Sequence, residues 1–127
     1  MKANQVQEIN ETEFDSQVLH CKKTVLVGFL TKWSQACERF IPVLEEVAAA
    51  CRGNAQVFQL DVDDNPDLGT RYGIQSVPTL LFFFNGIVRV KIVGTASAKA
   101  VLVKLQSLSQ QLNPAPGQEL RQTTTQP

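Results

Sequence analysis

The chain has 127 residues, 43% of them hydrophobic, and this size and composition fit one domain around one core. Its 12 basic residues balance its 12 acidic ones, so no overall field draws it to nucleic acid or to an anionic membrane, and we expect neither as a partner. No apolar run approaches the roughly 20 residues of a membrane helix, and the polar start lacks a signal peptide's apolar core, which predicts a cytoplasmic protein.

The first part of the chain predicts a strand, a helix and a buried strand. A short strand near Val6 to Ile9 comes first. Thr12 and Asp15 then resemble a capping box that opens a helix ending near His20. Residues Thr24 to Leu30 are almost wholly apolar, as a strand covered on both faces must be, so we expect this strand at the middle of the sheet.

The middle part of the sequence predicts a long helix, a strand and a short helix. From Ser34 to about Cys51 apolar residues recur at helical spacing, and Pro42 is expected to kink this helix. A strand over Val57 to Val62 follows. Asn65-Pro66 then combines a capping residue with proline at the first helical position, and Tyr72-Gly73 closes the short helix.

The last part of the sequence predicts a hairpin, a helix and a tail. Asn85-Gly86 is a strong hairpin signal between the buried strand Thr79 to Phe84 and its antiparallel partner Val88 to Val93, which Gly94 ends. Residues 113–127, rich in proline and threonine, are expected to be a disordered tail. One face of the final helix is lined by Ala98, Val101, Leu102, Leu105, Leu108 and Leu112.

Short motifs at characteristic spacings run through these elements. They are Trp33-x-x-x-Cys37, Pro42, Asp61-x-Asp63-x-Asn65-Pro66, Tyr72-Gly73-Ile74, Val77-Pro78-Thr79, Asn85-Gly86 and Gly94. In order and spacing they resemble the thioredoxin family over about residues 5 to 112. The resemblance implies an α/β thioredoxin fold for residues 1–112, with a central mixed sheet in the order βαβαβαββα and helices on both faces.

The resemblance also implies a changed active site. In the family, a cysteine thiolate at a helix N-terminus attacks a substrate disulfide, and a second cysteine one turn later resolves the mixed disulfide. Ser34 occupies the attacking position here, and its hydroxyl forms no bond analogous to a disulfide. We therefore expect no competent dithiol-disulfide reductase. The other departures are Gly28 for a buried Asp, Gln59 for its Lys partner, Gln35-Ala36 for Gly-Pro and Glu38 for Lys.

Ser34 and Cys37 each allow two interpretations. Ser34 is a favoured N-cap residue, so it can hold the helix start without any chemistry. Cys37 is either a small apolar core residue or a reactive monothiol. Cys51 lies 14 residues further along the same predicted helix, about 21 Å away, whereas a disulfide needs Cα atoms within about 7 Å. Cys21 is expected at the opposite end of the sheet, and all three thiols should be reduced.

The motif around Pro78 implies a peptide-binding surface. In the family this proline is cis, and the residue before it, here Val77, offers its backbone to an extended substrate segment. Trp33 fits this surface, although it equally fits a packing role at the helix start. His20, the only histidine, is expected to have a surface or capping role. The predicted groove residues are Trp33, Ile74, Val77, Pro78, Thr79 and Gly94.

Two functions follow from these residues. The first is a protein- or peptide-binding, chaperone-like module linked to redox homeostasis, which keeps the groove and lacks the thiol cycle. The second is a monothiol enzyme that uses Cys37 in thiol-disulfide exchange, with an external thiol such as glutathione completing the reaction. We expect no metal and no cofactor in either case.

Overall fold

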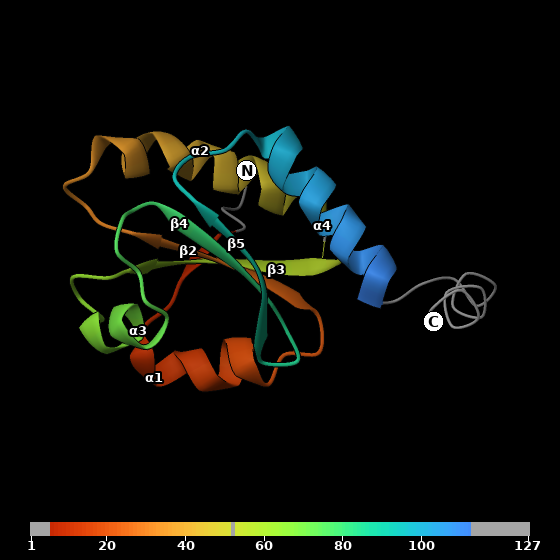
Figure 1. Ribbon diagram of the computed structural model, residues 1–127, viewed down its shortest axis with the longest axis horizontal. Coiled ribbons are helices and arrows are strands. Elements are labelled where there is room, and N and C mark those ends of the chain that lie inside the picture. The colour runs from red at the N-terminus through yellow and green to blue at the C-terminus, as the bar shows by residue number, and fades with distance from the viewer. Residues whose placement is uncertain (1–5, 52, 113–127) are drawn as a thin grey trace, which may run out of the picture.

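The computed structural model describes residues 6–51 and 53–112, and Figure 1 shows a twisted sheet between two layers of helices. The predicted disordered tail, residues 113–127, lies outside the described residues. In chain order the elements are β1 (Gln7–Glu8), α1 (Glu11–Phe14), the π-helical η1 (Asp15–Leu19), β2 (Thr24–Leu30), α2 (Gln35–Cys51), β3 (Ala55–Asp61), α3 (Pro66–Arg71), β4 (Thr79–Phe84), β5 (Ile87–Val93) and α4 (Ala98–Leu112).

The sheet is mixed and has β2 at its middle, as predicted. Its strand order is β1-β3-β2-β4-β5. β3 pairs in parallel with both β1 and β2, whereas β4 pairs antiparallel with β2 and β5. All seven residues of β2 are buried, which explains why its sequence is apolar at successive positions instead of alternating.

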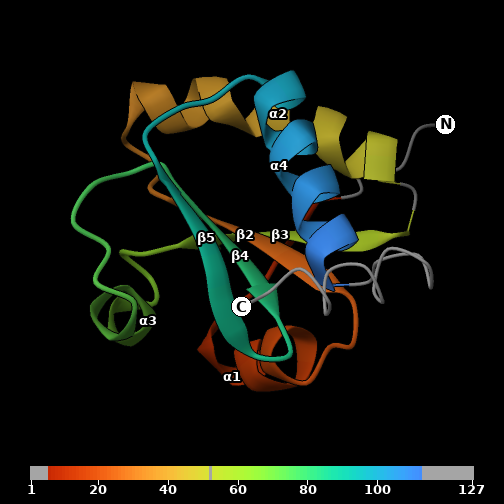
Figure 2. The same cartoon turned by 45° about the vertical axis from the view of Figure 1, so that its right-hand side comes forward.

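Helices cover both faces of the sheet. α2 and α4 lie on one face, and α1, η1 and α3 lie on the other (Figures 1 and 2). Each face has its own apolar cluster, because successive residues of a strand point to opposite sides. Leu26 belongs to the cluster under α2 and α4, and its neighbour Val27 belongs to the other. Full burial of a side chain such as Leu26 stabilises the fold by about 1.5–3 kcal/mol.

The predicted hairpin between β4 and β5 is confirmed. Asn85 and Gly86 have φ values of 55° and 77°, the pair of positive angles that a two-residue type I′ turn requires. Because the turn has two residues, β5 begins at Ile87, one residue before the predicted Val88. Glycine is required at residue 86, since a Cβ there would lie 3.0 Å from the carbonyl oxygen of Leu19.

The start of the first helix differs from the prediction. Asn10, in place of Thr12, is the N-cap, and its side chain accepts the Glu13 N–H while the Glu13 side chain accepts the Asn10 N–H. The predicted box of Thr12 and Asp15 is therefore wrong. Thr12 lies inside the first turn, where its hydroxyl donates to the Asn10 side chain. The predicted end is confirmed, because His20 is the exposed C-cap of η1.

The segment from β3 to α3 also differs in detail. β3 covers Ala55–Asp61, two residues earlier at its start than predicted. Pro66 begins α3 as predicted, but the side chain of Asn65 does not cap this helix. It is instead buried, accepts the N–H of Glu11 at 3.0 Å and donates to the Asp61 carbonyl at 2.9 Å. Asn65 therefore ties the start of α1 to the end of β3.

Pro42 lies inside α2, where the sequence places it. The kink that it is expected to cause stays a prediction. Tyr72 is the C-cap of α3, and Gly73 follows with a φ of 63°, so this helix ends as predicted.

Candidate functional site

β2, β3, β4 and β5 each begin or end at the same end of the sheet. The register pairs Leu30 at the end of β2 with Asp61 at the end of β3. It also pairs Phe29 with Thr79 at the start of β4. Thr79 pairs in turn with Val93 at the end of β5. The loops beyond these residues therefore gather at the end of the sheet where α2 begins (Figure 1).

Ser34 caps the N-terminus of α2. Its hydroxyl oxygen accepts the N–H of Cys37 at 3.2 Å, and its carbonyl accepts the N–H of Glu38 at 3.0 Å. These two bonds are the pattern of an N-cap serine, whose side chain satisfies an amide that the helix leaves without a partner. The geometry supports the capping interpretation of Ser34.

Replacing Ser34 with alanine is expected to lower the free energy of unfolding by about 1 kcal/mol, because the Cys37 N–H loses its acceptor. Chemical denaturation monitored by Trp33 fluorescence measures this change. Ser34→Asp is the matched control, since aspartate caps helices as well as serine does, and it should retain the stability to within a few tenths of a kcal/mol. Equal stability of all three proteins would contradict the capping role.

Cys37 is enclosed. It is 1% exposed and belongs to the apolar cluster that α2 and α4 form with the sheet. Its sulfur accepts the N–H of Thr31 at 3.5 Å, a contact that joins the loop after β2 to the first turn of α2. The arrangement is that of a core thiol, which offers little surface to an attacking or leaving group.

Neither of the other cysteines is placed to partner Cys37. All three cysteines are free. Cys51 is buried at the far end of α2, and burial raises the pKa of its thiol. Cys21 is half-buried and precedes β2, so it lies at the end of the sheet opposite Cys37. The placement agrees with the expectation from spacing.

Trp33 projects from the loop before α2. Its side chain is 73% exposed, and its indole N–H donates to the Asp63 carboxylate at 2.9 Å. Next to it, Lys32 and Asp64 form an exposed ion pair at 3.4 Å, and Asp64 holds the pKa of Lys32 above its usual value. The bond to Asp63 orients the indole without covering it. The sequence shows neither contact, because both cross about 30 positions of the chain.

The loop before β4 presents a free backbone. The Val77–Pro78 peptide bond is cis. Pro78 is buried and its carbonyl accepts the N–H of Gly94 at 2.8 Å, while the Thr79 hydroxyl donates to the Ser76 carbonyl at 2.8 Å. Within residues 6–51 and 53–112, no hydrogen bond involves the backbone of Val77. Val77 thus retains an N–H and a C=O for another chain.

Ile74 is set apart from the other groove residues. It packs against the cluster under α1 and α3, next to Tyr72, whereas Val77 packs against the cluster under α2 and α4. The structure therefore brings Val77, Pro78, Thr79 and Gly94 together through the strand register and places Ile74 beside the opposite face.

Comparison with known proteins agrees with this architecture. A family model described as Thioredoxin matches residues 5–107. The chain belongs to the thioredoxin family. It is 36% identical over 99 residues to the chloroplastic thioredoxin M-type of Pisum sativum, an alignment that covers 78% of this chain and 57% of that protein. It is 32% identical over 78 residues to the thioredoxin of Rickettsia felis, which covers 61% of this chain and 74% of that one.

A third relative is longer. The bifunctional thioredoxin reductase/thioredoxin of Mycobacterium leprae is 36% identical over 106 residues, which are 84% of this chain and 23% of that protein. The chain thus spans a little over half of the pea relative and about a quarter of the mycobacterial one. The predicted thioredoxin fold is confirmed.

In this thioredoxin-family domain, a side chain at residue 28 would have to displace a methyl group of Leu44. Gly28 stands where the resemblance puts the family's buried aspartate. A Cβ there would lie 2.9 Å from Cδ1 of Leu44, which is inside van der Waals contact. Leu44 is fully buried on α2, so its methyl group fills this part of the core. The sequence pattern indicates only that Leu44 belongs to the core, and it does not indicate this contact.

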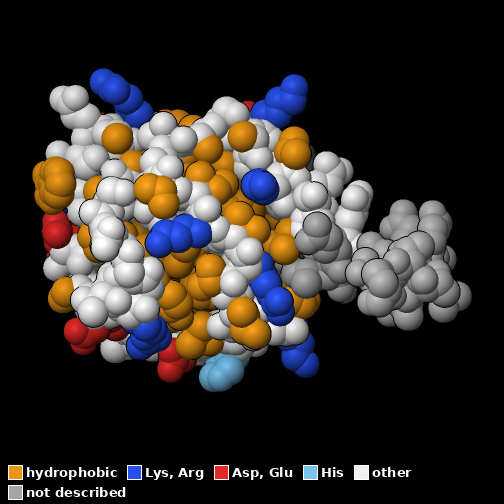
Figure 3. Space-filling view, in the orientation of Figure 1, with side chains coloured by type: hydrophobic (Ala, Val, Ile, Leu, Met, Phe, Trp, Pro, Cys, Tyr) orange, Lys and Arg blue, Asp and Glu red, His pale blue; other side chains and the backbone are white. Residues whose placement is uncertain are grey.

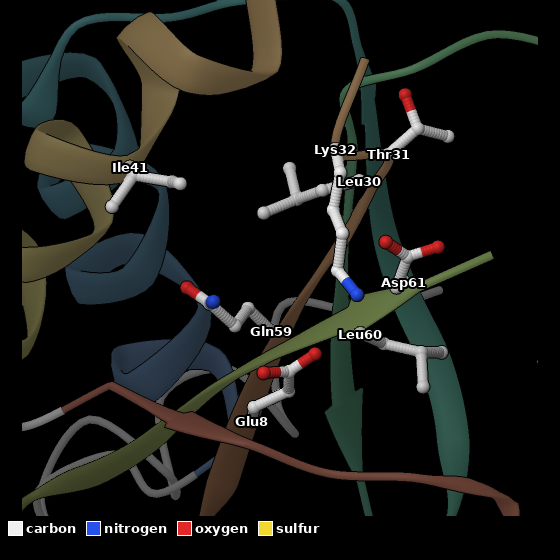
Figure 4. Close-up of a pocket in the computed structure, with 8 residues that line it drawn as sticks. All are labelled: Glu8, Leu30, Thr31, Lys32, Ile41, Gln59, Leu60 and Asp61. Atoms are coloured by element: carbon white, nitrogen blue, oxygen red, sulfur yellow. The ribbon is translucent and has the colours of Figure 1, made fainter. Parts of the chain in front are cut away.

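Gln59, whose side chain is a neutral amide, stands where the resemblance puts the family's lysine. Gln59 pairs with Gly28 across β2 and β3 and lines a cavity of about 100 Å³, room for a few water molecules (Figure 4). The charged groups around it come from Glu8, Lys32 and Asp61. The Asp61 carboxylate already accepts the N–H groups of the two residues that precede Asn65.

Two further observations apply to residues 6–51 and 53–112. They contain no group of three or more His, Cys, Asp or Glu side chains placed to hold a metal ion. No helix among them has both the length and the apolar content needed to cross a bilayer.

Proposed function

We propose that this thioredoxin-family domain binds an extended segment of another protein and does not reduce it. The observation that carries the proposal is the free backbone of Val77, at the same end of the sheet as the exposed indole of Trp33. A backbone N–H and C=O beside an apolar side chain are what an extended peptide needs to pair as a strand does. We place the bound segment along Trp33 and the backbone of Val77, next to the buried Thr79.

The same proposal states that the domain does not reduce a disulfide of the bound protein. Ser34 stands at the attacking position, and its oxygen is engaged with the Cys37 N–H. Gly28 and Gln59 supply neither an acid nor a cation for proton transfer. An acid at residue 28 would also require a methyl group of Leu44 to shift. The 1% exposure of Cys37 also argues against the monothiol alternative, since thiol exchange requires an accessible sulfur.

Replacing Trp33 with alanine is expected to weaken peptide binding about tenfold, as truncation of a central aromatic contact does. A suitable probe is reduced, carboxymethylated α-lactalbumin, which is unfolded and has no free thiol. Titration of this probe into labelled domain should shift the amide signals of Trp33 and Thr79.

Val103→Ala is the matched control for this experiment. Val103 is 56% exposed on α4, and it is not among the predicted groove residues. Its truncation should leave the affinity unchanged. If Trp33→Ala and Val103→Ala bind the probe equally well, or if the amides of Trp33 and Thr79 do not respond, the proposed surface is wrong.

A further inference from the structure

β5 is the outer strand of the sheet and pairs on one side only. It follows β4 in the strand order, and no described strand lies beyond it. The opposite edge strand, β1, has two residues, whereas β5 has seven. A long edge strand presents N–H and C=O groups that can pair with another chain.

The end of β5 shows which backbone groups point outward. The Gly94 N–H donates to the Pro78 carbonyl, so these two residues form a hydrogen-bonded pair. Hydrogen-bonded and non-hydrogen-bonded pairs alternate along antiparallel strands, so Ile92 bonds to β4 and its neighbours Lys91 and Val93 do not. The N–H and C=O groups of Lys91 and Val93 therefore point away from β4.

Exposed apolar side chains concentrate on this strand. Five large apolar side chains are exposed in the described chain, and three of them, Ile87, Val88 and Val93, are on β5. A fourth is Val103 on α4. Figure 3 shows apolar side chains gathered over the middle of this face, where Figure 1 places β5, with acidic side chains only toward its margin. Such a gathering favours an interaction surface over ordinary solvent exposure.

The charged side chains of β5 and α4 are all basic. Residues 86–118 contain four basic residues and no acidic one. Arg89 and Lys91 lie on β5, Lys99 and Lys104 lie on α4, and all four are exposed. No ion pair in the described chain includes any of them. A partner at this edge is therefore favoured if it carries acidic side chains.

The same charges disfavour a second copy of this chain in the register that aligns its basic residues. An antiparallel copy centred on Lys91 would set Lys91 opposite its own counterpart, and like charges that face each other across strands are destabilising, whereas a copy centred on Ile92 avoids this contact. A register shift between Phe82 and Phe83 marks a bulge on β5 at Arg89. An added strand therefore has the regular stretch of residues 90–93 to pair with.

We propose that the outer edge of β5 receives an acidic, extended segment of another protein as a sixth strand of the sheet. The backbone groups of Lys91 and Val93 make the pairing, and acidic side chains of the added strand lie opposite Lys91. A polypeptide fits this edge better than a lipid surface does, because donors and acceptors alternate along it. This edge adjoins the surface of Trp33 at Val93, which pairs with Thr79, but it uses different backbone groups and extends the function proposed above.

Hydrogen exchange on the full chain tests this proposal with the peptide acetyl-(Val-Glu)₅-amide as probe. Bound peptide should slow amide exchange at Lys91 and Val93, with little change at Ile92, which already bonds to β4, and at Gly94, which already bonds to Pro78. Lys91→Glu should weaken binding about tenfold. Lys99→Glu makes the same charge change on α4 and should weaken binding much less. Trp33→Ala should bind the probe as the wild type does, which separates this edge from the groove.

A second pair of variants tests the backbone pairing itself. Val93→Pro removes an outward N–H and should abolish protection at Lys91, whereas Val93→Thr keeps the N–H and should retain it. Amide signals of β4 report whether each variant is folded. The proposal is overturned if acetyl-(Val-Lys)₅-amide binds equally well, or if Lys91 and Val93 are not protected. Protection of Lys91 and Val93 at high protein concentration without peptide would overturn it in favour of a second copy of this chain. Protection of the same amides by phosphatidylserine vesicles would overturn it in favour of a membrane.

Discussion

Ser34→Cys is expected to give at most partial disulfide reductase activity, although it restores the two-cysteine motif. A cysteine at this helix N-terminus would gain some thiolate character from the helix dipole. The buried sulfur of Cys37 must still resolve the mixed disulfide, and Gly28 and Gln59 offer no group to move its proton. The turbidity assay of insulin reduction with dithiothreitol measures this. The wild type should run at the rate of dithiothreitol alone.

The matched control for this experiment is Ser34→Ala, which changes the same position without adding sulfur. It should remain at the background rate. A thioredoxin with both cysteines sets the upper limit. Turnover of Ser34→Cys at that upper limit would mean that the other departures from the family pattern, at Gly28 and Gln59 above all, have no functional weight.

The contact between Gly28 and Leu44 predicts a large coupling in stability. Leu44→Ala should lower the free energy of unfolding by about 2–5 kcal/mol, because it leaves a cavity in a closed core. Gly28→Ala should lower it by about 1–3 kcal/mol, because its Cβ is forced against Leu44. In the double variant the new methyl group enters the new space, so the loss should be clearly smaller than the sum.

Chemical denaturation of the four proteins gives the coupling energy. Val47→Ala is the matched control, since Val47 is fully buried on the same helix and is not among the nearest neighbours of a Cβ at residue 28. Its combination with Gly28→Ala should be additive to within about 0.5 kcal/mol. Additivity with Leu44→Ala as well would show that Leu44 does not fill the space beside Gly28.

Most of the fold could be predicted from local patterns. The apolar run of β2 indicated its central place, because a strand covered on both faces has no polar side. Asn85-Gly86 indicated the hairpin, because both residues accept positive φ angles. The capping box was misplaced by two residues, since Asn10 with Glu13 and Thr12 with Asp15 both have suitable spacing. Only the extended backbone at Asn10 distinguishes the two.

The candidate site was less predictable. The capping role of Ser34 and the separation of Cys37 from Cys51 follow from helix geometry, and the place of Cys21 follows from its position before β2, so the sequence was enough for all three. The contact of Trp33 with Asp63 and the packing of Leu44 against Gly28 join residues from different elements. Such contacts depend on how loops and layers meet in space. No local spacing indicates them.

The most direct test of the proposed function is whether binding survives without the Cys37 thiol. Affinity for carboxymethylated α-lactalbumin is measured for the wild type and for Cys37→Ala, with amide spectra showing that both are folded. Because Cys37 is buried, we expect equal affinities and no mixed disulfide when the wild type is incubated with oxidised glutathione. Loss of binding in Cys37→Ala, or a glutathione adduct on Cys37 in the folded wild type, would contradict this account and favour the monothiol enzyme.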